Sequence, residues 1–215
     1  MKSIKTKTIV QSSLKPMVVA IAMAAALPAH AVRFDIGELE GQFDSSISIG
    51  SSWATASPDK DFIWANSGGN ANAANTDDNR LNFDKGDAFS TIFKGIHDLS
   101  LQYGSTGFFL RGKYWYDFEL KDGHQDLYDI SDDNRKTAAK GSGVQLLDAF
   151  LYHNYSIGDM PGSVRIGKQV VSWGESTFIQ NGINSINPID VAAFRRPGAE
   201  IKEGLIPVNM LYLSQ

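Results

Sequence analysis

Residues 108–120 read FFLRGKYWYDFEL, and their polarity alternates from one position to the next. The even-numbered positions are apolar, aromatic or Gly, whereas the odd-numbered positions include four charged side chains. Because successive side chains of a β-strand point to opposite faces, the stretch predicts a long strand with one apolar and one charged face. The charged face carries Arg111, Lys113, Trp115, Asp117 and Glu119.

The same period of two recurs along the chain, although it is less regular in residues 144–157. It predicts six strands, at about 42–53, 89–103, 108–120, 144–157, 163–173 and from 205 onward. Short turns alternate with long polar connections, which fall at about 54–88, 121–143 and 174–204. Strands joined by a tight turn must pair in antiparallel fashion.

This rhythm of connections predicts the fold class. Compact soluble domains seldom contain several structureless loops longer than about 15 residues. Outer-membrane barrels alternate short turns with long loops, and strands of about 9–11 residues or more suit a tilted crossing of the bilayer. We therefore predict an all-β fold, an antiparallel transmembrane β-barrel of the outer-membrane porin type, of which residues 32–215 form about six strands. A soluble periplasmic β-sandwich is the alternative, since its strands also alternate.

The first 31 residues are predicted to be a Sec-type signal peptide. Four lysines precede the apolar run 17–27, and Ala29-His30-Ala31 forms a small-x-small cleavage site. Their removal takes the formal net charge from -4 to -8, because four lysines leave and no carboxylate does. An acidic exported chain is a poor ligand for nucleic acid. The chain has no cysteine, which is compatible with an oxidising cell envelope.

Sequence motifs for catalysis and cofactors are absent. The chain has no GxSxG, HExxH, Walker or GxGxxG motif, and His97, His124 and His153 show no metal-ligand spacing. We predict that the protein is not an enzyme and has no cofactor or bound metal. An outer-membrane enzyme remains an alternative, with His97 or His153 as its base.

A second group of candidates comes from the segment 165–203, which mixes charges of both signs with the turn formers Asn187-Pro188 and Pro197-Gly198. Two readings stay open. The connection 174–204 either folds back to form a constriction or plug, or it is an external loop whose surface ion pairs contribute little. The candidates are Arg165, Glu175, Asp190, Arg195, Arg196, Glu200, Lys202 and Glu203.

Three motifs in series carry a family resemblance: RIGKQVVSWGE at 165–175, GINSINPID at 182–190 and RPGAEIKE at 196–203. Together with FDIGELEG at 34–41, they resemble the DUF1302 family of exported proteobacterial proteins. The resemblance implies a porin-like outer-membrane barrel that handles apolar or lipid-like molecules, with a periplasmic DUF1329-like protein and an RND-type exporter as partners. It implies no catalytic residue.

Six strands cannot close a barrel, because the smallest natural barrels have eight. We therefore expect the chain to be the N-terminal portion of a larger barrel. The predicted function is an outer-membrane channel or transporter for hydrophobic or amphipathic compounds, embedded in outer-membrane lipid. The alternatives are an adhesin or structural barrel and, less favoured, a lipid-active enzyme.

Overall fold

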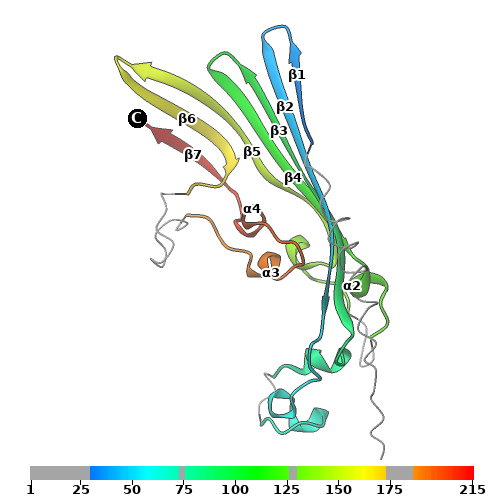
Figure 1. The fold of residues 1–215 in the computed structure, drawn as a ribbon. Coiled ribbons are helices and arrows are strands. Elements are labelled where there is room, and N and C mark those ends of the chain that lie inside the picture. Colours follow the sequence, from blue (N-terminus) through cyan, green and yellow to red (C-terminus); the bar gives the residue numbers. More distant parts are fainter. Residues whose placement is uncertain (1–29, 73–75, 126–129, 173–185) are drawn as a thin grey trace, which may run out of the picture.

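The protein is described by a computed structural model that covers residues 30–72, 76–125, 130–172 and 186–215. The fold is one antiparallel sheet in which each strand pairs with its neighbours in the sequence, and the sheet is open (Figure 1). Its strands are β1 (His30–Ile36), β2 (Leu39–Trp53), β3 (Ala88–Tyr103), β4 (Thr106–Asp117), β5 (Ser142–Ile157), β6 (Met160–Gln169) and β7 (Val208–Ser214).

The antiparallel all-β prediction is confirmed, but the predicted strand number was wrong. The structure has seven strands in the described residues, because His30–Ile36 forms β1 and pairs with β2 from Ile36↔Leu39 to His30↔Ser45. Its alternation of Val32, Phe34 and Ile36 with polar residues spans too few positions to have stood out in the sequence. The predicted signal peptide lies outside the described residues except for His30 and Ala31, which belong to β1.

The sheet has two chemically different faces. The inner face carries Arg111 and Lys113 of β4, as the alternation predicts, together with Lys94 of β3. The outer face presents exposed apolar side chains from every strand pair, among them Ile49, Phe93, Val144, Ile166 and Leu211. The sheet curves around its inner face, and the short helices α3 (Val191–Phe194) and α4 (Ile201–Gly204) lie in the hollow (Figure 1).

β4 ends three residues earlier than predicted. Asp117 accepts hydrogen bonds from the backbone N–H groups of Glu119 and Leu120, and it thereby caps the helix α2 (Phe118–Asp122). Asp is one of the preferred N-cap residues because its carboxylate satisfies amides that lack a partner within the helix. Glu119 is therefore a residue of α2, and it does not continue the charged face of the strand.

A β-bulge explains the irregular polarity of the fourth predicted strand. The β4–β5 register passes from Leu110↔Ala149 to Gly112↔Leu146, which gives β5 one extra residue. Leu147 and Asp148 are both buried on the inner face. As a result, the residues of β5 that face outward have even numbers before the bulge and odd numbers after it. Unbroken alternation over the predicted strand 144–157 would place Leu147 on the same face as Leu151, but the added residue shifts the phase, so the two side chains lie on opposite faces.

The hairpin turns lie at one end of the sheet and the long connections at the other (Figure 1). The first connection, 54–87, contains the 3-10 helices η1 (Lys60–Phe62), η2 (Ala65–Ser67) and η3 (Asp78–Asn82). The second, 118–141, contains α2 and η4 (Thr137–Ala139), and the third, 170–207, contains α3 and α4. Within the described residues, no helix is long and apolar enough to cross a membrane.

Candidate functional site

Four of the five candidates on the predicted charged strand lie on the inner face. Arg111 is partly buried, whereas Lys113, Trp115 and Asp117 are at most 4% exposed. Glu119 is separated from them, because its carboxylate accepts a hydrogen bond from the hydroxyl of Thr91 at 3.4 Å. Thr91 lies on the outer face, where it also bonds Ser51. The alternation of β4 thus positions a charged row only as far as Asp117.

Arg111 is the centre of a three-residue charge cluster that links three strands. Its Nε and Nη2 donate to the two carboxylate oxygens of Asp98 on β3, at 2.7 and 2.6 Å. Its Nη1 lies 3.6 Å from the carboxylate of Asp148, which the bulge of β5 turns to the inner face. A two-point pairing of guanidinium and carboxylate fixes direction as well as charge. The cluster therefore holds these three side chains in set positions on the inner face.

Lys94 and Glu203 form the most buried ion pair of the described residues. The ammonium of Lys94 on β3 contacts the carboxylate of Glu203 on α4, and the two side chains are 4% and 3% exposed. Glu203 also accepts a hydrogen bond from the backbone N–H of Glu200 at 3.0 Å, within a capping box. Because a buried charge is costly without a partner, this pair fixes α4 against the sheet.

Residues 187–205, here called the inward segment, lie across the inner face. The side chain of Asn187 accepts from Val171 N–H and donates to the carbonyls of Gln169 and Ile206, which ties the base of the segment to the ends of β6 and β7. At its other end, the segment packs closely against Gly50 of β2. A side chain at that position would bring its Cβ to 2.7 Å from Pro197, so only Gly leaves room for this contact. The segment therefore reaches from β6 to β2.

Arg196 connects the inward segment to β4 and to the second connection. Its guanidinium lies 4.8 Å from the ring centroid of Trp115, and it donates to the carbonyl of Ala138. Burial lowers the pKa of Arg196 from its ordinary value, but an arginine stays protonated at neutral pH. The contact therefore places a permanent positive charge over an aromatic ring, an attractive arrangement.

The other candidates have different positions. Asp190 caps α3 by accepting from the amides of Ala192 and Ala193, and Lys202 pairs with Glu200 at 3.1 Å. Arg165 of β6 lies between the rings of Phe150 and Tyr212, in the part of the sheet nearer the hairpin turns. Glu175 lies outside the described residues.

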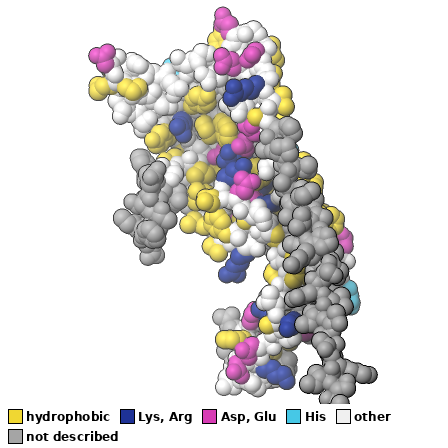
Figure 2. Space-filling model, in the orientation of Figure 1, with side chains coloured by type: hydrophobic (Ala, Val, Ile, Leu, Met, Phe, Trp, Pro, Cys, Tyr) yellow, Lys and Arg dark blue, Asp and Glu magenta, His cyan; other side chains and the backbone are white. Residues whose placement is uncertain are grey.

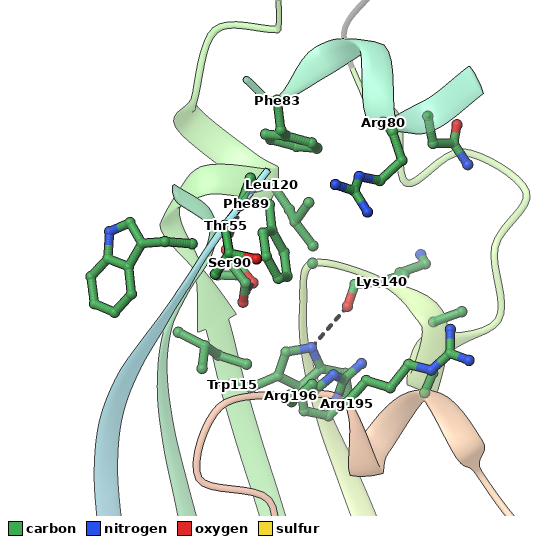
Figure 3. A pocket seen from close by; sticks show the side chains of 18 residues that line it. Thr55, Arg80, Phe83, Phe89, Ser90, Trp115, Leu120, Lys140, Arg195 and Arg196 are labelled. Atoms are coloured by element: carbon green, nitrogen blue, oxygen red, sulfur yellow. Dashed lines mark hydrogen bonds between the residues drawn. The ribbon is translucent and has the colours of Figure 1, made fainter. Parts of the chain in front are cut away.

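A cavity of about 640 Å³ opens beside the inward segment, between it and the first two connections. Figure 3 shows Phe83, Phe89, Leu120 and Trp115 around it, with Arg80 on one side and Arg195 and Arg196 on the other. We call it the loop-end cavity. The indole N–H of Trp115 donates to the carbonyl of Lys140 at 2.9 Å, and this hydrogen bond joins two residues of the cavity wall. This volume is in the range of small-molecule sites.

A protein-family model described as a protein of unknown function, DUF1302, matches residues 14–215. The chain belongs to the DUF1302 family. No curated protein and no solved structure matches the chain. The predicted family membership is therefore confirmed, and the three motifs quoted above lie within the matched residues.

Sequence reasoning missed Lys94 and Asp98, the β3 partners of Glu203 and Arg111 in this DUF1302 protein. The alternation that places Asp98, Ser100 and Gln102 on one face extends back to Lys94, so the signal was present. Arg80 was also missed, and no local pattern identifies it, because it approaches the cavity from an irregular connection.

The inner face of the DUF1302 sheet combines charged and apolar side chains. Basic and acidic side chains alternate along its middle, with hydrophobic groups beside them (Figure 2). In the part of the chain that the structure describes, no three His, Asp or Glu side chains are grouped to hold a metal ion. Charges held in fixed positions can sort molecules that pass by.

Proposed function

We propose that the sheet is part of the wall of an outer-membrane β-barrel, and that the inward segment is the constriction of a channel for hydrophobic or amphipathic compounds. One observation carries the proposal: residues 187–205 fold onto the charged face of the sheet, where Glu203 pairs with Lys94. A loop anchored on the lumen face narrows a barrel and sets its selectivity.

The outer face supports the membrane location. Ile49, Val144 and Leu211 expose 60%, 78% and 70% of their surfaces, and they come from strands spread across the sheet. Contiguous apolar surface of this kind is rare on soluble proteins. Strands of 10–16 residues from β2 to β6 are long enough for a tilted crossing of the bilayer.

The proposed setting follows the family resemblance. The chain is exported through a Sec-type signal peptide and functions among outer-membrane lipids, without catalysis. The transported compound is a small molecule with an apolar body, and the proposed partners are a periplasmic DUF1329-like protein and an RND-type exporter.

Single-channel recording in planar bilayers, on the complete barrel of whose wall this sheet is a part, tests the constriction. Glu203→Gln removes the charge that pairs with Lys94, so we expect the inward segment to loosen and the conductance to rise. Lys113→Gln removes a buried cation on the inner face, so we expect the reversal potential in a salt gradient to move toward cation preference.

The control is Glu38→Gln, in the exposed turn between β1 and β2, and it should leave both measurements unchanged. If the complete wild-type barrel forms no channel, the proposal is wrong, and an adhesive or structural role becomes the better explanation. Unchanged conductance after Glu203→Gln and after deletion of 188–204 would contradict the constriction alone.

A further inference from the structure

We propose that the loop-end cavity binds an amphipathic anion, a small carboxylate with an apolar body. The proposal rests on the proposed function, since it names the class of compound that the channel would select. The chemistry of the cavity wall carries it: aromatic and aliphatic groups form the body of the cavity, and arginines gather at its sides.

The apolar part of the wall comes from four separate elements. Phe83 follows η3, Phe89 and Ile92 lie on β3, Leu120 belongs to α2 and Trp115 to β4. The rings of Phe83 and Phe89 meet edge to face, with centroids 6.2 Å apart. Groups fixed by four elements form a shaped apolar surface, which favours the tail of an amphipathic ligand over water.

The cationic part comes from two opposite sides. Arg80 projects from η3 above the cavity, whereas Arg195 and Arg196 project from the end of α3 below it (Figure 3). Within the described residues, none of the three arginines forms an ion pair. Among the described residues, Arg80 donates to the carbonyl of Ala56, at 3.2 Å, and Arg196 donates to that of Ala138. Arg196 also lies near the carboxylates of Asp190, Glu203 and Asp117, so Arg80 and Arg195 supply the charges that are available to a carboxylate.

Asp117 is the acidic residue of the wall, and its charge is already satisfied. It accepts from the hydroxyl of Ser90 at 2.5 Å and from the amides of Thr91, Glu119 and Leu120 at 3.1–3.3 Å. These donors are neutral groups in fixed positions, so Asp117 needs no arginine as a counter-ion. The cavity keeps an excess of positive charge, which favours an anion.

Binding is tested by titrating the protein in lipid nanodiscs with octanoate, octylammonium and 1-octanol, which share one tail and differ in charge. We expect calorimetric affinity for octanoate to exceed that for octylammonium at least tenfold, after subtraction of the signal from empty nanodiscs. The double variant Arg80→Gln/Arg195→Gln should lose at least tenfold in octanoate affinity and little for octanol. Arg33→Gln on β1 makes the same kind of charge change outside the cavity and should change neither affinity.

A second variant tests the cavity without altering charge. Ala192→Trp places a large side chain at an exposed position of the lining, so it should abolish octanoate binding while the sheet stays folded. Equal affinity for octanoate and octylammonium, or octanoate binding unaffected by both variants, would overturn the proposal. Conductance distinguishes the two proposals: a conducting protein that does not bind octanoate contradicts only the anion site, and binding without conductance contradicts only the channel.

Discussion

Gly167 shows how a single residue can control the sheet. It has a φ of +132°, and a Cβ at this position would lie 2.4 Å from the carbonyl oxygen of Ala149. It pairs with Phe150, close to the bulge at Leu147 and Asp148 that brings Asp148 toward Arg111. Only Gly adopts this backbone conformation without strain, so the local geometry of β6 depends on it.

Gly167→Ala is expected to lower the free energy of unfolding by on the order of 1–3 kcal/mol or more, since it adds backbone strain and a steric clash. Urea denaturation in detergent measures the change.

The matched control is Gly112→Ala, on β4, which flanks the same bulge from the other side of β5. Its Cβ would meet only the carbonyl of Gln145, at 4.0 Å, so the change should stay within about 0.5 kcal/mol. Equal losses from the two variants would show that Gly167 has no special role.

At the scale of elements, the connection 54–87 is organised around one carboxylate. Asp78 accepts from the hydroxyl of Thr76 at 2.6 Å, the amide of Trp64 at 3.0 Å and the hydroxyl of Ser67 at 2.8 Å. The hydrogen bond from Thr76 lowers the pKa of Asp78 most, followed by those from Trp64 and Ser67. Because Arg80 follows two residues later, this carboxylate also sets one side of the loop-end cavity.

This lowered pKa predicts how the connection responds to pH. The ionised carboxylate stabilises it fully above the ordinary Asp pKa of about 3.9, and that contribution is lost as the pH falls through the lower folded value. Hydrogen-exchange protection of the Trp64 amide, the slowing of its rate relative to that of an unfolded chain at the same pH, should therefore fall in strongly acidic solution. Asp78→Asn cannot ionise, so its Trp64 amide should show low protection at every pH, and protection equal to that of the wild type would contradict this role.

At the scale of the whole molecule, the inward segment joins parts of the sheet that are distant in sequence. Glu200 accepts from Ser46 on β2 at 3.4 Å, Glu203 pairs with Lys94 on β3, and Arg196 lies over Trp115 on β4. These contacts connect residues about 80–150 positions apart. The fold therefore works as a curved wall whose hollow holds one of its own connections.

Cross-linking tests this arrangement in the membrane. The chain has no cysteine, so Ser46→Cys/Glu200→Cys provides a unique pair for a short bifunctional thiol reagent. We expect efficient intramolecular cross-linking in outer-membrane fractions, with conductance unchanged because the segment already lies there. The control pair Ser46→Cys/Ser163→Cys, with its second position on β6 near the hairpin turns, should not cross-link. Failure of the first pair would show that the segment leaves the inner face.

The sequence by itself determined the local part of this structure. Alternating polarity placed β2, β3 and β4, assigned Arg111, Lys113, Trp115 and Asp117 to one face, and indicated antiparallel pairing through the short turns. These features depend on neighbouring residues, because the period of two is a property of the extended backbone. The family motifs predicted membership of the DUF1302 family, which the match over residues 14–215 confirmed.

Only the tertiary structure decided the bulge at Leu147, the end of β4 at Asp117, the pairing of Lys94 with Glu203 and the loop-end cavity. Each depends on where a distant segment returns to the sheet, and no local period encodes that path. The sequence left open whether 174–204 lies inside or outside, because mixed charges suit both positions. In the structure, the inward segment brings the carboxylate of Glu203 to Lys94, and both groups are buried. Because burying either charge without the other would be costly, the segment is held at this one position.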